Sequence, residues 1–248
     1  MKMGSMVRRG SGALALLVVV GVACGQAANG AQEGAVQEPA VQEPAAQGGG
    51  SGGASSARAG SPGSPQRVPL NNLGFDRGRP DAPVLVLEFS DFGCPYCSRF
   101  ALQTLPQIDS EFIAKGTVRW KYVPFVMGMF PNGGEAARAA ECAADQDRSQ
   151  FWRMHDKLYG NQREWRGTTD PETLFLGYAK SLGLDEKAFA ACYGSDHVKN
   201  LIAANNEMAA RLGVQATPTF FVNGVRIQGA LPIEQFRLFL RGAAAGGN

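Results

Sequence analysis

Several features are scarce in this 248-residue sequence, and each absence excludes a class of function. Neither sign of charge predominates, with 24 Lys and Arg against 22 Asp and Glu, so the chain lacks the basic surface that nucleic-acid binding requires. It has only two histidines, His155 and His197, and no second cysteine pair repeats the spacing of Cys94 and Cys97. We therefore expect no metal site, because structural zinc usually takes four such ligands.

The longest apolar run, residues 13–23, is also short for a membrane span. A helix that crosses a bilayer needs about 20 apolar residues. Arg8 and Arg9 precede this run and small residues follow it, which is typical of an export signal. The sequence therefore predicts an export signal over residues 1–24.

Cys24 ends this predicted signal. The segment Val22-Ala23-Cys24-Gly25 resembles the lipobox of bacterial lipoproteins, in which the cysteine is lipidated and becomes the new N-terminus. Gly21 departs from that pattern, because the family usually has an aliphatic residue there. The resemblance implies a lipid anchor at Cys24, in the periplasm or on the outer face of a bacterial membrane. Ordinary secretion and an uncleaved anchor are the alternatives.

Residues 25–66 contain little that could build a core. The sequence AVQEP occurs at residues 35–39 and again at 40–44, and glycine, serine and alanine follow. Such a composition buries too little apolar surface to offset the entropy lost on ordering. We expect a disordered tether over residues 25–66 and a folded domain over residues 67–243.

The most informative motif of that domain is Cys94-Pro95-Tyr96-Cys97. Disulfide formation needs Cα atoms about 4.4–6.8 Å apart, and helix positions i and i+3 approach to roughly 5–6 Å. The pair can therefore close and reopen without a change in the backbone, which favours redox chemistry. A structural disulfide and half of a zinc site are the alternatives.

The place of the motif in the chain also favours redox chemistry. The apolar run 84–89 predicts a buried strand, and Cys94 would cap the helix that follows, with Pro95 as its first residue. The Cys94 sulfur would then face unpaired N–H groups and the positive end of the helix dipole. Both stabilise a thiolate, which is the reactive form. Cys97, one turn later, would be shielded and would resolve mixed disulfides.

The remaining pattern predicts an α/β domain. The alternation at residues 118–122 indicates a second strand, which completes a βαβ unit. Helical patterns follow between about residues 133 and 213. Residues 219–222 and 225–227 then form a hairpin around Asn223-Gly224, and a last helix contains residues 233–240.

This order resembles the DsbA-like thiol:disulfide oxidoreductases. It implies a thioredoxin fold (βαβ…ββα around a central mixed sheet) with an all-helical insertion at about residues 133–213. Cys94-Pro95-Tyr96-Cys97 matches the active-site motif of that family, and Thr217-Pro218 matches its cis-proline loop. Tyr96 is a departure, because the best-known members have histidine there. The resemblance implies that Pro218 is cis and that Thr217 binds the backbone of a client peptide; an ordinary trans proline is the alternative.

Glu88 is the one carboxylate within the first apolar run. A buried, unpaired acid has a raised pKa, and the alternation places Glu88 beneath the cysteines. The resembling family has a buried acid at this position, which transfers a proton to or from the inner cysteine. A Glu88 exposed at a sheet edge is the alternative. His155 lies on an apolar helical stripe, so we interpret it as a packing residue.

Cys142 and Cys192 fall on two predicted helices of the insertion. Apart from Cys24 the chain has four cysteines, and an even number in an oxidising compartment suggests two pairs. We predict a structural Cys142–Cys192 disulfide. Two buried free thiols or a second redox centre are the alternatives.

These patterns together predict an exported thiol:disulfide oxidoreductase that needs no cofactor and acts as an oxidase. Its expected partners are cysteine-containing exported proteins and a membrane redox protein, either a quinone-linked oxidase or a donor of thiol reductant. A disulfide reductase or isomerase of the same fold is the nearest alternative. A non-catalytic peptide-binding module and a glutathione-dependent transferase are more distant ones.

Overall fold

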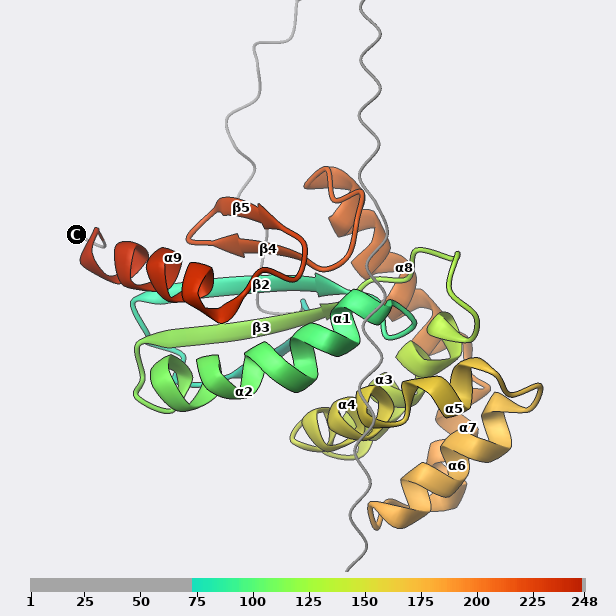
Figure 1. The fold of residues 1–248 in the computed structure, drawn as a ribbon. Helices are drawn as coiled ribbons and strands as arrows, with labels where there is room; N and C mark the ends of the chain where they lie inside the picture. The colour runs from blue at the N-terminus through green and yellow to red at the C-terminus, as the bar shows by residue number, and fades with distance from the viewer. Residues whose placement is uncertain (1–72, 247–248) are drawn as a thin grey trace, which may run out of the picture. The chain divides into compact units, whose positions relative to one another are not determined.

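The computed structural model describes residues 73–246, so the predictions for residues 1–24, for Cys24 and for the tether at 25–66 lie outside the described residues. Five strands form one mixed sheet in the order β1-β3-β2-β4-β5 (Figure 1). β2 and β3 are parallel, and the other neighbouring pairs are antiparallel. The strands are β1 (Phe75–Arg77), β2 (Val84–Ser90), β3 (Val118–Pro124), β4 (Thr219–Val222) and β5 (Val225–Gln228).

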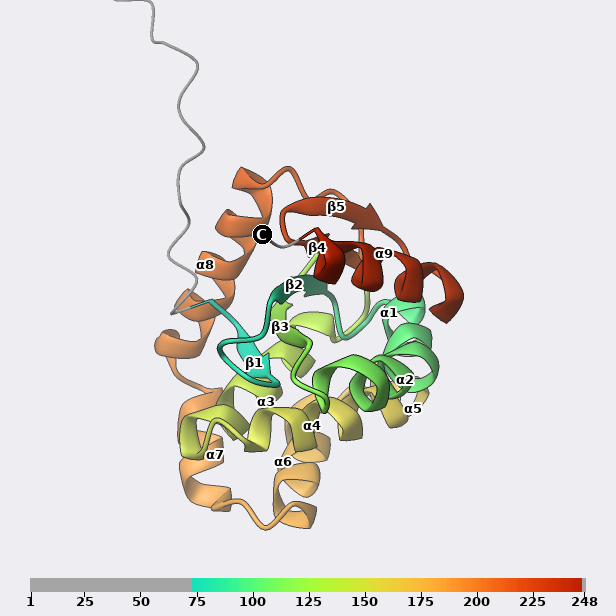
Figure 2. The same cartoon turned by 90° about the vertical axis from the view of Figure 1, so that its left-hand side faces the viewer.

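The central strand β2 is buried on both faces, as its apolar sequence predicts. Val84 and Val86 pack on the face covered by α1 (Pro95–Arg99), α2 (Leu105–Ile108) and α9 (Ile233–Ala245). Leu87 and Phe89 face α8 (Asp196–Arg211) on the other side. Figure 2 shows the sheet between these helices. Glu88 and Ser90 alternate with Leu87 and Phe89, so their side chains point toward α1.

The helix that follows the cysteines continues from α1 through α2, with π-helical turns at Phe100–Thr104 and Asp109–Ile113. Pro106 lies inside it and has no N–H to donate. In the turn before Pro106 the hydrogen bonds have the wider π-helical spacing, because the Leu105 N–H donates to the Phe100 carbonyl. A π-helical turn thus precedes Pro106 in this helix. Gly116 follows with φ +74°, a conformation that favours glycine.

The described chain is helical between β3 and β4. Alanines on α3 are fully buried and allow α4 and α7 to pack closely against it. Side chains of Asp170, Asp185 and Ser195 cap three of these helices by accepting backbone N–H bonds. The helices are α3 (Gly133–Gln146), α4 (Gln150–Gly160), α5 (Gln162–Arg166), α6 (Pro171–Ser181), α7 (Glu186–Tyr193) and α8.

The β4–β5 hairpin turns at Asn223-Gly224, where both residues have positive φ (45° and 88°), as the sequence predicts. Asn223 also anchors the hairpin, because its side-chain oxygen accepts the Leu85 N–H at 2.8 Å. Within residues 73–246, no helix combines the length and the apolar character that a membrane crossing would need.

Candidate active site

Cys94 lies where the central strand passes into helix α1. It caps α1, and Pro95 is the first helical residue, in the positions that the sequence predicts. Asp91 holds the short turn before it: one carboxylate oxygen accepts the Gly93 N–H, and the other accepts the Met127 N–H, both at 2.8 Å. Sequence reasoning missed Asp91, although an acid two residues before glycine is a pattern of Asx turns. Asp91 thus connects the cysteine turn to the loop after β3.

The two cysteines are free thiols with opposite shifts in acidity. The hydrogen bond with the Cys97 thiol is the largest cause that lowers the pKa of Cys94, to about 6; Thr217 and the N–H groups of Cys97 and Tyr96 add to it against the effect of burial. Burial raises the pKa of Cys97 well above its usual value, and the neighbouring Cys94 raises it further. The sequence analysis attributed the acidity of Cys94 to the helix N-terminus alone, whereas the hydrogen bond with the Cys97 thiol lowers the pKa of Cys94 more.

Glu88 lies on β2, two residues before the end of the strand, and is fully buried. One carboxyl oxygen accepts the Ser90 hydroxyl at 2.5 Å, and the other accepts the Trp120 indole N–H at 2.8 Å. Burial raises the pKa of Glu88 to about 7, because its effect exceeds that of the two hydrogen bonds, which lower it. Glu88 can therefore take up or release a proton near neutral pH.

The loop before β4 contacts Cys94 from the other side. The Thr217–Pro218 peptide bond is cis, and the Thr217 carbonyl accepts the Cys94 thiol at 3.5 Å. The Thr217 hydroxyl points to the sulfur of Met127 at 3.4 Å. Segments far apart in sequence thus meet at the one sulfur whose acidity is increased.

A cavity of about 620 Å³ borders the motif. It lies between α1 and the α4–α5 junction, and Pro95, Arg99 and Arg163 are among its lining residues. Tyr96 beside it is 57% exposed, with the Arg99 guanidinium 5.1 Å from its ring. Exposed aromatic and cationic side chains therefore lie next to the motif that contains the buried Cys94.

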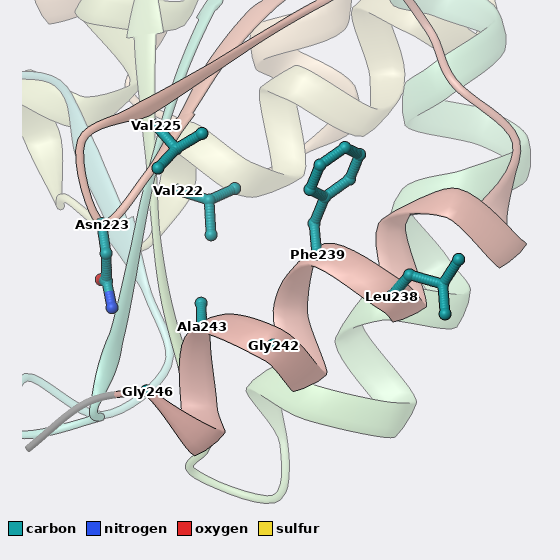
Figure 3. Close-up of a pocket in the computed structure, with 8 residues that line it drawn as sticks. All are labelled: Val222, Asn223, Val225, Leu238, Phe239, Gly242, Ala243 and Gly246. Atoms are coloured by element: carbon teal, nitrogen blue, oxygen red, sulfur yellow. The ribbon is translucent and has the colours of Figure 1, made fainter.

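A second cavity, of about 400 Å³, lies between the β4–β5 hairpin and α9, with Val222, Val225 and Phe239 pointing into it (Figure 3). The neighbouring Asn223 N–H bonds the Leu85 carbonyl near the start of β2, whereas Cys94 follows the end of β2. This cavity is therefore at the opposite end of the sheet and contributes nothing to the cysteine site.

The structure joins Cys142 of α3 to Cys192 of α7, with Cα atoms 5.6 Å apart. That separation is within the range of ordinary disulfides. His155 is buried among aromatic rings, and its Nδ1 lies 2.8 Å from the Asp156 carboxylate. Burial, its largest influence, lowers the pKa of His155. Among residues 73–246 no cluster of three acidic, cysteine or histidine side chains could hold a metal ion.

Residues 73–241 match the family model described as Thioredoxin. The probable disulfide bond formation protein D of Bacillus cereus is 32% identical over 149 residues, which is 59% of this chain and 68% of that protein. The Na(+)/H(+) antiporter NhaA 1 of Salinispora arenicola is 38% identical over 170 residues, which is 68% of this chain. The chain spans only 24% of that antiporter.

Among solved structures, oxidised BdbD from Bacillus subtilis matches with a TM-score of 0.66 and 26% identity. The match covers 71% of this chain and 95% of BdbD. The predicted thioredoxin fold with a helical insertion is therefore confirmed.

Proposed function

We propose, because this chain belongs to the thioredoxin family and has the fold of its DsbA-like members, that it oxidises thiols of exported proteins to disulfides through Cys94 and Cys97. The observation that carries this proposal is the unequal acidity of the pair. The pKa of Cys94 is about 6, whereas burial holds the pKa of Cys97 well above that of a free thiol. One sulfur is thus a good leaving group, and the other is a shielded partner.

The reaction would begin with the Cys94–Cys97 pair oxidised. A client thiolate attacks the Cys94 sulfur, the disulfide bond breaks, and its electron pair leaves with the Cys97 sulfur. A second client thiolate then attacks the client sulfur of the mixed disulfide. Cys94 leaves as a thiolate, the client retains a disulfide, and both enzyme cysteines are reduced. Electrons move only between sulfur atoms, so no cofactor is required.

The low pKa of Cys94 also supports oxidation as the direction. A stable thiolate stabilises the reduced enzyme, so the oxidised enzyme readily transfers its disulfide. Thr217 supports the binding of clients, because its backbone lies against Cys94 and can pair with an extended peptide. Glu88 would supply the proton that Cys97 needs when it leaves.

Measuring the reduction potential against glutathione tests the direction. We expect a value closer to the about −120 mV of DsbA than to the about −270 mV of thioredoxin. A value near that of thioredoxin would favour the reductase or isomerase alternative. A protein that neither oxidises dithiols nor reduces insulin would be a binding module instead. A Cys94→Ser variant is the control for uncatalysed exchange.

We also propose export and lipid anchoring at Cys24, which the signal-like residues 1–24 support. At the membrane surface the reduced enzyme would meet a membrane redox protein. For an oxidase, that partner accepts two electrons from the Cys94–Cys97 dithiol; for a reductase, it would donate them.

A further inference from the structure

Ser90, the last residue of β2, is fully buried against the carboxyl group of Glu88. It lies two residues after Glu88, so both side chains project from the same face of the sheet. The Ser90 carbonyl is held by the Phe125 N–H at 2.9 Å and by the Tyr122 hydroxyl at 3.4 Å. The position of the Ser90 side chain is therefore defined by the ends of two paired strands.

The Ser90 hydroxyl contacts both proton-exchanging groups. It donates to a Glu88 oxygen at 2.5 Å, and its interaction with the Cys97 thiol lowers the pKa of that thiol against the larger effect of burial. A hydroxyl donates one hydrogen and accepts others, and it can rotate between two partners. The second Glu88 oxygen is occupied by the Trp120 indole, which can only donate. The oxygen bonded to Ser90 is therefore the one available for proton transfer.

We propose that Ser90 carries the proton between Glu88 and Cys97 during disulfide exchange. This inference rests on the proposed function. When the client thiolate breaks the Cys94–Cys97 bond, the Ser90 hydroxyl gives its proton to the Cys97 sulfur and takes the proton of the Glu88 carboxylic acid. When Cys97 later acts as a nucleophile, the same proton returns to Glu88. Ser90 is neither oxidised nor reduced, and one proton moves in each direction.

The other titratable groups around Glu88 and Cys97 are engaged in hydrogen bonds with other partners. Tyr122 and Tyr159 hydrogen-bond each other at 2.8 Å, and burial raises the pKa of both well above 10. The Asp91 carboxylate accepts hydrogen bonds from the backbone N–H groups of Gly93 and Met127. Burial raises the pKa of Asp91, and these two backbone hydrogen bonds and the nearby Arg166 lower it by less.

The test is the rate at which a dithiol such as dithiothreitol reduces the oxidised enzyme between pH 5 and 9. Loss of general acid catalysis typically costs 10²–10⁴-fold, so for a relay we expect Ser90→Ala to be roughly 10- to 100-fold slower near pH 6. The difference should shrink above the Glu88 pKa of about 7, because that acid is then deprotonated. A merely structural defect would slow the reaction at every pH.

Matched variants separate the hydroxyl from the shape of the side chain. Ser90→Thr should restore the hydroxyl and react at a rate close to that of the wild type. Ser90→Val, which is isosteric with the threonine variant but has no hydroxyl, should be as slow as Ser90→Ala; this pair decides the question if the alanine variant fails to fold. Glu88→Gln should also be slow. The Glu88→Gln/Ser90→Ala double variant should be no slower than either single variant, because the two residues act in series.

Suppose that the wild type is active and that Ser90→Ala or Ser90→Val reacts within about twofold of the wild-type rate at pH 6. This result would overturn the relay but not the proposed function, since the loss expected for a relay is far larger. Losses that multiply in the double variant would also overturn it. A wild type that exchanges no disulfide would overturn the proposed function, and the relay with it.

Discussion

Replacing Cys97 with serine is expected to convert transient exchange into stable mixed disulfides between Cys94 and client proteins. In the variant the Cys94 thiolate can attack a client disulfide, which releases one client sulfur as a thiolate and leaves the other bonded to Cys94. The buried Cys97 would normally attack the Cys94 sulfur and free the client. Serine cannot perform this attack. Non-reducing electrophoresis of the variant from the native cell envelope should show adducts that disappear when a reductant is added.

Cys94→Ser is the matched control for this experiment. It removes the acidic sulfur, so it should form no adducts and should lose dithiol oxidation by at least roughly 10⁴-fold, as expected when the residue that forms the covalent intermediate is deleted. Adducts that persist without Cys94 would place the reactive sulfur elsewhere in the chain. A Cys97→Ser variant without adducts would contradict a role on proteins.

The second large effect is expected on stability. The Cys142–Cys192 bond links residues 50 positions apart in the sequence, and in the chain-entropy model such a closure stabilises by about 4 kcal/mol. The double variant Cys142→Ala/Cys192→Ala should lose about that much free energy of unfolding. For a domain of this size the loss corresponds to a melting temperature roughly 10 °C lower. Thermal unfolding followed by circular dichroism measures it.

The exchange rate of the same double variant shows whether this disulfide takes part in the reaction. Because it joins two helices of the insertion and not the strand–helix turn of Cys94, exchange at 25 °C should stay within about twofold of wild type, as for a change distant from the reacting atoms. Full stability with lost exchange would instead identify Cys142 and Cys192 as a second redox centre.

The elements that sequence could predict are those with strong local signals. The strand predicted from the apolar run 84–89 is buried on both faces, and Asn223-Gly224 forms the hairpin turn. The sequence analysis missed the three-residue strand β1, because residues distant in the sequence stabilise it. Phe75 pairs with Tyr122 of β3, and its ring stacks on that of Phe151 with the centroids 3.7 Å apart. The short helix α5 was missed for a similar reason. The indole N–H of its Trp165 donates a hydrogen bond to the Leu158 carbonyl of the preceding helix, α4.

The same distinction applies to the site, where some residues have a clear signal in the sequence and others do not. The spacing of Cys94 and Cys97 and the single acid at Glu88 are visible in the sequence, so their chemistry could be predicted. Ser90 could not be singled out, because serine is ordinary at a strand end, and the Asx-turn pattern of Asp91 does not by itself indicate a site. Their importance comes from contacts with Glu88, Gly93 and the distant Met127. The large contribution of the Cys97 thiol to the acidity of Cys94 likewise depends on three-dimensional geometry.

Titration of the Cys94 thiolate by its ultraviolet absorbance in the reduced protein is the most direct test of the account. We expect a single transition near pH 6, which is absent from Cys94→Ser, together with alkylation that accelerates through that pH and then levels off. A transition at about 8.5, the value of free cysteine, would contradict the account, because Cys94 would then be an ordinary thiol and a poor leaving group.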